Sequence, residues 1–537
     1  MPAGYDVLIV GNGPVGQTLS IMLAQRGFSV GVVERWPAPY PQPRAVAYDH
    51  DVARIFDSLG ISEELAEISV QSPEYDWRNA DGRTLLHFDS RGVADSGWPN
   101  NSMFSQPRLE ALLAKRAATF PTIDLRLGQE AVDIVEGDAS VEVAVKGPSA
   151  RQRTLTARYV VGCDGANSFV REHLGTSVTD LGFFYDWLIL DVIPHEERQW
   201  RPFNLQVCDP QRPRTIVSGG PGRRRWEFMR LPTETVEELN TEETAWRLLA
   251  EWDLTPDNAT LERHTVYTFQ ARWADEWRSG RLILAGDAAH LMPPFAGQGM
   301  CSGIRDAANL AWKLDLVLRD KAPAELLDTY TSERTAHIRH AIGMSVALGN
   351  VICATDPAVV AARDEAMLKA EGRPDVALGP VPPAVLGPGI SQTDAEGQPL
   401  PAPVGTLGGQ RNVMNRAGET GLFDRVVGRG FVVAVTAGKC VLPEELVLGL
   451  RDLGAHLVRF VSPGTAQLED DDFQTLVDVD SFYLPRMVKE GQEAVIIRPD
   501  FYLFGAVSDR ADLPALVQDL FVKIGTKSPL PTTRGSA

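Results

Sequence analysis

The start of the chain alternates short apolar runs, glycines and an amphipathic stretch. Residues 5–10 are mostly apolar and too few for a helix of usual length, and residues 30–34 form a second apolar run that ends in an acid. Between the two runs, Val15, Leu19 and Met22 recur at helical spacing. The pattern therefore predicts a strand, a helix and a second strand, which together form the βαβ unit of a parallel sheet.

Three glycines and one acid indicate that the turn of this unit binds a dinucleotide. Gly11 permits a tight turn, Gly13 lets the backbone approach a pyrophosphate, and Gly16 allows the helix to pack closely on the strand. The free N–H groups at the helix start favour phosphate. Glu34, about 20 residues beyond the glycines, is placed to accept hydrogen bonds from a ribose. The alternative is a glycine turn that holds no ligand.

Periodic patterns continue through the middle of the chain. Residues 36–43 are a proline-rich loop that cannot join a helix or a sheet ladder. Helical spacing predicts helices over residues 52–59, from 105, 303–319 and 324–348. Short apolar or alternating runs predict strands at residues 75–88, 124–145 (a meander), 159–162, 187–192, 215–218, 226–229 and 281–287. Residues 175–275 therefore form a region rich in short strands and aromatic residues, inserted before the chain returns to its first domain.

The last third of the chain is separated by a segment rich in proline and glycine, residues 372–409, which indicates a linker. Beyond it, strands are predicted at residues 431–435, 457–461, 494–498 and 502–507, and helices at 444–453 and 513–524. This alternation is typical of a small, separate α/β domain.

Composition limits the class of protein. A chain of 537 residues with 44% apolar and 23% charged residues is expected to form several globular domains. The net charge of −19 argues against nucleic acid and against an anionic membrane as partners. The five cysteines are scattered without CxxC or metal-ligand spacing, and the chain starts without a leader pattern or a long apolar span. We therefore expect a cytoplasmic protein without a metal site.

Two further motifs follow strands in this order. Asp164-Gly165 ends one apolar run before a helix, and Gly286-Asp287 ends another before a segment of proline and glycine, residues 293–299. Each dipeptide alone is usually only a turn. The combination with the opening glycines is what makes the pattern specific.

On these three motifs the chain resembles the class A flavoprotein monooxygenases, which hydroxylate phenols, over residues 5–350. The run at residues 297–314 is most similar to the 3-(3-hydroxyphenyl)propionate hydroxylases. The resemblance implies an α/β FAD-binding domain of the Rossmann-like, glutathione-reductase type, an inserted sheet-bearing substrate domain and a thioredoxin-like C-terminal α/β domain. The implied boundaries are residues 1–175 with 276–370, residues 176–275, a linker at 371–409 and residues 410–537. Disulfide exchange in the last domain is not expected, because it lacks CxxC.

The resemblance also assigns cofactor contacts. Glu34 would hold the adenosine ribose, Arg44 the FAD phosphates and Gln106 the ribityl chain, while Asp164 would link FAD and NAD(P)H and Asp287 would contact the ribityl or pyrophosphate. The turn at residues 293–299 would lie beside the isoalloxazine, where the helix N-terminus that follows stabilises the negative charge of reduced flavin. The full implied set of cofactor residues is Gly11, Gly13, Pro14, Gly16, Glu34, Arg35, Arg44, Gln106, Asp164, Asp287, Pro294, Gly297, Gly299 and Met300. Arg44 and Gln106 have plainer alternatives, as a solvated loop arginine and as a polar residue at a helix start.

The implied chemistry is that of the cofactor. NAD(P)H reduces FAD, reduced flavin captures O2, and a flavin C4a-hydroperoxide transfers oxygen to a ring carbon ortho or para to a hydroxyl. The protein must keep this site dry and orient the phenol, and Pro294 and Phe295 would form part of the pocket wall.

The residue that takes the phenol proton is not evident from the sequence. Asp49 and His50 are the nearest titratable pair to the expected cofactor edge, although Asp49 equally fits a helix N-cap. His290 favours a structural hydrogen bond, and strand alternation places His264 and Tyr267 on opposite faces. Among other candidates, Arg214 and residues 223–225 would receive a substrate carboxylate, or the three adjacent arginines form a solvated turn.

We therefore predict an FAD-dependent monooxygenase that hydroxylates a substituted phenol of the 3-hydroxyphenylpropionate type with NAD(P)H and O2. Alternatives are the same chemistry on a polycyclic or nitro-substituted aromatic, and a flavin redox protein without hydroxylation. A homodimer is allowed. The sequence leaves open the substrate, the ring position and the choice between NADH and NADPH.

Overall fold

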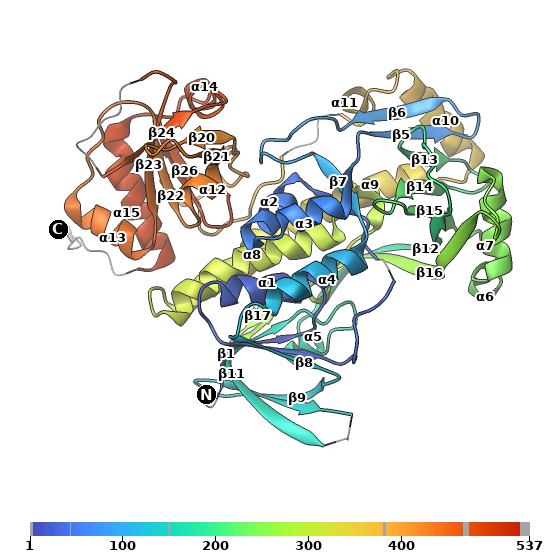
Figure 1. The fold of residues 1–537 in the computed structure, drawn as a ribbon, viewed down its shortest axis with the longest axis horizontal. Coiled ribbons are helices and arrows are strands. Elements are labelled where there is room, and N and C mark those ends of the chain that lie inside the picture. Colours follow the sequence, from blue (N-terminus) through green and yellow to red (C-terminus); the bar gives the residue numbers. More distant parts are fainter. Residues whose placement is uncertain (1–3, 43, 149–150, 380–382, 466–471, 527–537) are drawn as a thin grey trace. The chain divides into compact units, whose positions relative to one another are not determined.

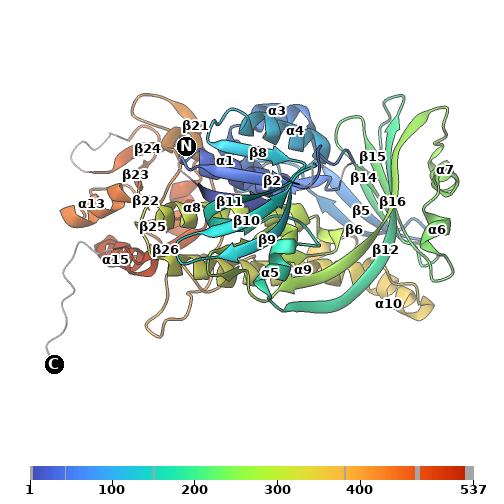
Figure 2. The ribbon, with the colours of Figure 1, turned by 90° about the horizontal axis from the view of Figure 1, so that it is seen from below.

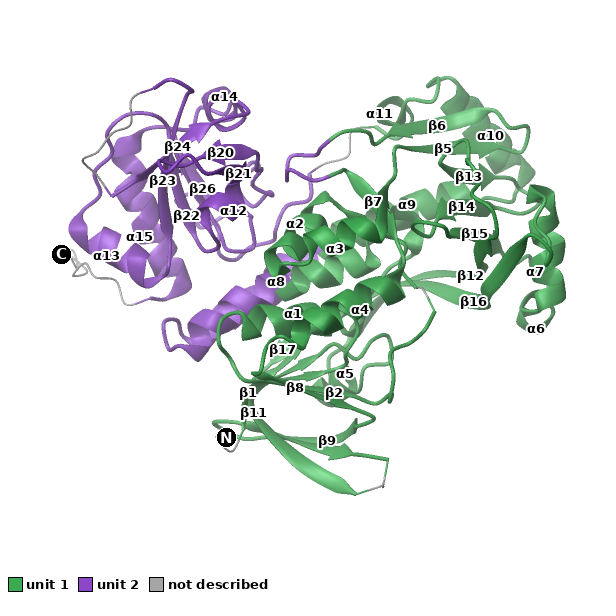
Figure 3. Ribbon diagram, viewed as in Figure 1, with its two compact units in different colours: residues 1–92, 99–307, 338–382 green, residues 93–98, 308–337, 383–537 purple. Residues whose placement is uncertain are grey.

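The computed structural model describes residues 4–42, 44–148, 151–379, 383–465 and 472–526. Predictions that fall on Pro43, on residues 380–382 of the linker and on residues 466–471 and 527–537 of the last domain lie outside this part. The chain divides into two compact units (Figure 3). Unit 1 comprises residues 1–92, 99–307 and 338–382, and unit 2 comprises residues 93–98, 308–337 and 383–537. Most of the residues predicted to bind FAD, and those predicted to bind the substrate, lie in unit 1. The division into two units therefore does not separate the predicted FAD-binding domain from the predicted substrate domain.

The predicted βαβ unit forms the centre of the first sheet of unit 1 (Figure 1). β1 (Tyr5–Val10) pairs in parallel with β2 (Val30–Glu34) and with β11 (Gln152–Gly162), and α1 (Pro14–Ala24) connects β1 to β2. The order across the sheet is β17 (Arg278–Ser279), β18 (Leu282–Leu284), β11, β1, β2 and β8 (Ile123–Leu127). Because β11, β1, β2 and β8 run parallel, as does β18, the loops that follow them meet at one edge, where such sheets bind ligands.

A second sheet supplies the other half of unit 1. Its order is β19 (His290–Leu291), β16 (Ala259–Ala274), β12 (Val178–Pro194), β15 (Arg224–Met229), β14 (Arg214–Ser218), β13 (Asn204–Cys208), β5 (Glu74–Asn79) and β6 (Thr84–Asp89). On one face, buried residues that include Leu190, Trp226 and Phe228 pack against α6 (Val236–Leu239) and α7 (Glu242–Leu249), which lie along the outer side of the sheet in Figure 2. The opposite face is therefore the one available to a ligand.

The other elements of unit 1 surround these sheets. A small sheet contains β3 (Ala47–Asp49), β7 (Asn101–Phe104) and β4 (Ser69–Gln71), and β9 (Glu130–Glu136) and β10 (Val141–Lys146) extend the first sheet through β11. The helices are α2 (His50–Leu59), α3 (Ser62–Glu67), α4 (Gln106–Ala117), α5 (Phe169–Leu174), α10 (Pro357–Leu368) and α11 (Pro374–Ala377). α8 (Gly299–Leu318) and α9 (Asp328–Ile352) have residues in both units. The short 3-10 turns of the chain are η1 (Ala250–Trp252), η2 (Gly286–Ala288), η3 (Pro294–Ala296), η4 (Ala324–Leu327) and η5 (Arg510–Asp512).

Unit 2 contains a seven-stranded sheet. The order is β21 (Thr420–Leu422), β20 (Asn412–Met414), β24 (Gln474–Asp478), β23 (His456–Val461), β22 (Val432–Val435), β25 (Ala494–Ile497) and β26 (Leu503–Val507). The helices are α12 (Phe423–Val427), α13 (Glu444–Asp452), α14 (Tyr483–Lys489) and α15 (Leu513–Ile524). The predicted strands and helices of this region are confirmed, and β20, β21, β24, α12 and α14 were not predicted.

Two strand predictions need correction. The prediction of a meander over residues 124–145 is wrong for its first strand. β8 pairs in parallel with β2. Antiparallel pairing joins β9 to β10 and β10 to β11. The strand pattern predicted over residues 75–88 is confirmed as the antiparallel pair of β5 and β6. However, β5 pairs in parallel with β13, so the second sheet draws strands from outside residues 176–275. Pairing partners of this kind are tertiary choices that a local pattern cannot contain.

Within the described residues, no single helix is long and apolar enough to cross a bilayer. One pair of helical segments, 324–352 and 357–368, meets the length and composition test only when taken together, and the two are bent by 109°.

Candidate active site

Two cavities meet at the edge of unit 1 where the parallel strands end. The smaller, of about 210 Å³, is lined by the turns after β1, β2 and β11. The larger, of about 580 Å³, extends from the same turns to the second sheet and the start of α8. Both are lined by Gly13, Arg44, Cys163 and Gly165. The shared residues make one elongated site, as a dinucleotide requires.

The three glycines of the opening turn have different surroundings. Gly11 has φ of +103°, and a Cβ there would lie 2.4 Å from the carbonyl oxygen of Cys163. A Cβ on Gly16 would lie 2.2 Å from the carbonyl oxygen of Gly11, so Gly16 is a packing position and lines neither cavity. A Cβ on Gly13 would meet nothing within 4 Å. Gly13 caps α1 without a side-chain hydrogen bond, so the start of this helix is open to a ligand.

The last residue of β2, Glu34, and the two residues that follow it line the smaller cavity. The Glu34 carboxylate accepts hydrogen bonds from the backbone N–H groups of Asn12 and Trp36, both at 2.9 Å. Arg35 lines the same cavity, with its guanidinium 5.4 Å from the centre of the Trp36 ring. Glu34 is thus held in one orientation, with the cavity beside it for a ribose.

Arg44 and Gln106 lie where the two cavities join. The Gln106 side chain accepts a hydrogen bond from the backbone N–H of Ala45 at 2.6 Å and donates one to Glu110 at 2.6 Å. The Arg225 guanidinium donates to the carbonyl oxygen of Arg44 at 2.7 Å. The loop is therefore held from both sides, while the Arg44 side chain stays 46% exposed, 3.9 Å from Glu110.

Asp164 fixes the turn between β11 and α5. Its carboxylate accepts hydrogen bonds from the Ser168 hydroxyl at 2.5 Å and from the Val170 N–H at 3.1 Å. Burial raises the pKa of Asp164, and these donors oppose the rise. Asp164 also lines the smaller cavity.

Asp287 faces the larger cavity and is exposed to it. The surrounding protein nevertheless raises the pKa of Asp287 through burial, while His290 and Arg44 oppose the rise. The buried Asp306 holds this turn by accepting hydrogen bonds from the Gly286 N–H at 3.0 Å and from His290 Nε2 at 2.7 Å. The prediction that His290 makes a structural hydrogen bond is confirmed.

The segment at residues 293–299 borders the larger cavity together with the first turn of α8. The cavity is lined there by Pro294, Phe295, Ala296, Gly297, Gly299 and Met300. The nearest atom to a Cβ would be 3.9 Å away at Gly297 and 4.0 Å away at Gly299, which leaves the backbone open to the cavity. The Phe295 ring packs edge-on against Trp187 and Phe269, with ring centres 5.6 and 5.7 Å apart. Phe295 is thus a rigid part of the pocket wall, as predicted.

The assignment of Asp49 and His50 to catalysis is not supported by the geometry, because neither residue lines either of these two cavities. Asp49 is the N-cap of α2 and accepts a hydrogen bond from the Val52 N–H at 3.3 Å. Its carboxylate also accepts hydrogen bonds from Gln298, at 2.9 Å, and from Arg305. We therefore correct its role to positioning the turn at residues 293–299.

The arginines of the second sheet were also misjudged. Residues 224 and 225 are not a solvated turn but the first residues of β15, and both side chains are buried. The pKa of Arg224 falls to about 9 on burial, and its guanidinium stacks on Trp200 at 4.9 Å. Arg223 pairs with Glu262 at 3.0 Å. Of the arginines proposed to receive a carboxylate, only Arg225 lines the larger cavity.

Several polar side chains of the second sheet reach the larger cavity and were missed in the sequence. They are Tyr75, Asn204, Gln206, Thr215 and Glu227, and Ser72, which precedes β5, lines the same cavity. Alternation along residues 224–229, with Trp226 and Phe228 on the core side, was the signal that could have found Glu227. His264 Nδ1 lies 3.0 Å from the side-chain oxygen of Asn240, on the face of the sheet that α6 covers. Tyr267 packs with hydrophobic residues on the opposite face. Their predicted placement on opposite faces of β16 is therefore confirmed.

The residues present fit FAD. The open N-termini of α1 and α8 and the elongated cavity suit a ligand that carries phosphates at one end and an electron-accepting ring at the other. Glu34, Arg35 and Gly11 would hold the adenosine half, Gly13, Pro14, Arg44 and Asp287 the middle, and residues 294–300 the flavin ring. Bound FAD supplies the reduction of O2 and the transfer of one oxygen atom to an aromatic ring.

We expect Asp287→Ala to weaken FAD binding by about tenfold, because an acceptor of a charge-assisted hydrogen bond is lost from the cavity wall. Retention of flavin on serial dilution measures the effect. Asp275→Ala is the control, since Asp275 bonds Thr179 at 2.6 Å outside both cavities and its loss should leave flavin binding unchanged. Undiminished affinity in Asp287→Ala would contradict this placement of the cofactor.

Comparison with known proteins agrees with the geometry. Residues 4–345 match the family described as FAD binding domain, and residues 405–523 match the HcaD C-terminal domain. A relative from Rhodococcus jostii (strain RHA1), named a probable NADH-specific resorcinol 4-hydroxylase, is 35% identical over 98% of this chain and 97% of its own length. A 3-(3-hydroxy-phenyl)propionate/3-hydroxycinnamic acid hydroxylase from Mycolicibacterium gilvum (strain PYR-GCK) is 34% identical over 99% of this chain and 94% of its own. The solved structure of the flavin-dependent monooxygenase PieE with FAD and substrate shares the fold, with a TM-score of 0.80, 20% identity and coverage of 97% of this chain and 99% of that one.

Matches of this length and identity establish the class of enzyme, and they confirm the resemblance drawn from the three motifs. The chain belongs to the FAD-dependent aromatic hydroxylases, which use NAD(P)H and O2 to hydroxylate an aromatic ring.

Proposed function

We propose that the substrate is a small, uncharged phenol such as resorcinol. The observation that carries this proposal is the balance of charge on the substrate side of the larger cavity. Arg225 is the cation there, and its guanidinium donates to the Asp191 carboxylate at 2.7 and 3.0 Å. Glu227 lies 3.8 Å from the same guanidinium and lines the cavity. A substrate carboxylate would meet a cation that is already neutralised and an acid that repels it.

The size of the cavity favours a single ring. A volume of about 580 Å³ lies within the range of pockets that hold one small organic ligand. The flavin ring must occupy part of it, so the remaining space suits one substituted benzene ring better than a polycycle. Phe295, Trp77 and Phe88 supply apolar walls that exclude water from it.

A second candidate is a phenol with a carboxylate side chain, as in the name of the Mycolicibacterium relative. Arg44 favours it, because this half-exposed guanidinium also lines the larger cavity. We rank it second because Arg44 lies at the junction of the cavities, where we propose that it binds the FAD phosphates.

Related assignments are part of the same proposal. NADH is the proposed reductant, as in the name of the Rhodococcus relative. The domain boundaries predicted from the sequence, a homodimer, a cytoplasmic location and the cofactor contacts of individual residues remain proposals.

The C-terminal domain is proposed to be thioredoxin-like, because parallel β22, β23 and β24 are flanked by antiparallel β25 and β26, with Cys440 as its only cysteine.

A substrate panel tests the proposal. We expect resorcinol to accelerate NADH oxidation and to give a trihydroxybenzene in nearly equal amount. We expect kcat/KM for 3-(3-hydroxyphenyl)propionate to be at least about tenfold lower, since an unpaired charge would enter the cavity. A preference for the carboxylate substrate would favour the second candidate, and peroxide without hydroxylated product from every phenol would contradict both.

A further inference from the structure

The cavity-facing side of β15 carries an acid, Glu227, to which no part in the reaction has yet been assigned. Successive residues of a strand point to opposite faces. Trp226 and Phe228 lie in the core under α6 and α7, so Arg225 and Glu227 point to the other side, where both line the larger cavity. In the sheet register Glu227 lies opposite Thr215, which also lines the cavity. The acid therefore sits on a polar strip of the substrate-side wall.

Glu227 is buried yet poorly compensated within the protein. The residue is 8% exposed, and its nearest cation, Arg225, is 3.8 Å away, beyond hydrogen-bonding distance. Among the residues that the structure describes, none donates a hydrogen bond to the Glu227 carboxylate. Asp191, by contrast, accepts two hydrogen bonds from Arg225. Because Glu227 lines the cavity, a ligand hydroxyl that enters the cavity can donate a hydrogen bond to this carboxylate.

The charges around Glu227 make it a good proton acceptor. Burial raises the pKa of Glu227, Arg225 on the same strand lowers it, Asp191 on β12 raises it, and Arg263 on β16 lowers it, with a net upward shift. Tyr75, on β5 of the same sheet, also lines the cavity, and burial first, then Glu227, raise the pKa of its hydroxyl group, so it stays neutral. A carboxylate with a raised pKa matches more closely the acidity of a phenol.

We propose that Glu227 accepts the hydrogen bond of a substrate hydroxyl and takes its proton as the ring is hydroxylated. The O–H bond of the phenol breaks, its electron pair stays on the phenol oxygen and enters the ring, and the proton forms an O–H bond on Glu227. The ring carbons ortho and para to that oxygen become more nucleophilic. This inference rests on the proposed phenol substrate, and it assigns the proton acceptor that neither Asp49 nor His50 provides.

Glu227→Gln tests the inference in the holoenzyme, because the amide keeps the shape and one acceptor but cannot take the proton. We expect kcat for hydroxylation to fall about 100-fold, KM for resorcinol to change by only a few-fold, and the yield of product per NADH to drop. In the wild type, kcat/KM should fall as pH decreases through the pKa of Glu227, since only the carboxylate accepts a proton. In Glu227→Gln this acidic limb should be absent, and Glu227→Asp should restore it in part.

Glu262→Gln is the matched control. Glu262 pairs with Arg223 at 3.0 Å, belongs to the same sheet and lines neither cavity, so its kinetics and pH profile should match the wild type. Equal flavin content in all variants excludes misfolding as the cause. Coupled hydroxylation in Glu227→Gln within twofold of the wild type, with the acidic limb retained, would overturn the inference. If the wild type does not accept resorcinol, the proposed substrate class fails, and the same comparison on the phenol it does hydroxylate still decides the role of Glu227.

Discussion

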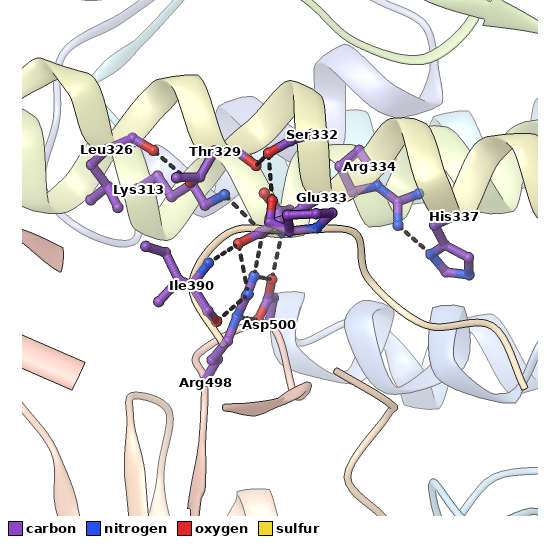
Figure 4. A network of polar contacts seen from close by, with 12 residues as sticks. Lys313, Leu326, Thr329, Ser332, Glu333, Arg334, His337, Ile390, Arg498 and Asp500 are labelled. Atoms are coloured by element: carbon purple, nitrogen blue, oxygen red, sulfur yellow. Dashed lines mark hydrogen bonds and ion pairs between the residues drawn. The ribbon is translucent and has the colours of Figure 1, made fainter. Parts of the chain in front are cut away.

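Replacing Glu333 with glutamine is expected to lower the free energy of unfolding of unit 2 by about 3–5 kcal/mol. The Glu333 carboxylate is fully buried and accepts five hydrogen bonds (Figure 4). The donors are Asn309 at 2.8 Å, Lys313 at 2.8 Å, the Ile390 N–H at 2.6 Å and Arg498 at 2.9 and 2.8 Å. These residues come from α8, from the segment before the C-terminal domain and from the loop after β25. An amide would leave two buried cations with half their partner charge and would turn an NH2 group toward donors.

Calorimetry should detect this loss as a transition about 10 °C lower. The control is Glu490→Gln, which removes an exposed i,i+4 pair with Arg486 at 3.1 Å and should cost less than about 1 kcal/mol. Burial alone would raise the pKa of Glu333, but Arg498 and Lys313 outweigh burial and hold it well below the usual 4.5. The advantage of the wild type over the variant should thus be complete above pH 4.5 and shrink as pH falls below it. Equal transitions for Glu333→Gln and the control would show that the network contributes no net stability.

Gly13→Ala is expected to reduce FAD affinity by about 100-fold, since the added methyl group would keep a phosphate away from the N–H groups at the start of α1. Gly13 has φ of −74° and ψ of −177°, which alanine adopts freely, and a Cβ there would meet nothing within 4 Å. The protein without cofactor should therefore keep its Tm. Flavin release on dilution and thermal unfolding of the apoprotein separate the two effects.

Substitutions at two other glycines of the same βαβ unit serve as controls for Gly13→Ala. At Gly27, φ is +86° and a Cβ meets nothing within 4 Å, but the residue lines neither cavity. Gly27→Ala should cost about 1 kcal/mol of stability and leave flavin affinity unchanged. Gly16→Ala, with its Cβ 2.2 Å from a backbone oxygen, should destabilise the unit itself. Normal FAD binding by Gly13→Ala would mean that the pyrophosphate does not approach this turn.

The cofactor end of the site could be predicted because its chemistry is local. Gly11, Gly13 and Glu34 belong to one βαβ unit, whose apolar period and glycine spacing are visible in a short window. The start of α4 near residue 105 and the end of α2 at residue 59 were similarly readable, since helix ends depend on a few adjacent residues.

The substrate end could not be predicted in the same way. Arg225 looked like part of a solvated cluster, and its burial depends on Asp191, which is 34 residues away and becomes its neighbour only when β12 and β15 pair. Asp49 was assigned to catalysis because it lies near Arg44 in sequence. In the structure its carboxylate accepts hydrogen bonds from Gln298 and Arg305, which are distant in sequence. From the sequence, a charged residue can be judged only by its neighbours along the chain. Its burial and its ion pairing depend on residues that are distant in sequence.

The amino-acid sequence by itself determined the βαβ unit and the positions of the later Asp–Gly and Gly–Asp turns, because glycine spacing and apolar period are set by adjacent residues; the FAD cofactor followed from the resemblance that these three motifs carry. Only the tertiary structure decided which polar groups share the larger cavity. The order of the second sheet brings Tyr75, Gln206, Thr215 and Glu227 together from four strands, and the register of β15 turns Glu227 inward. A cavity is made by packing between segments remote in sequence, so its electrostatics, and with them the proposed substrate, belong to the fold as a whole.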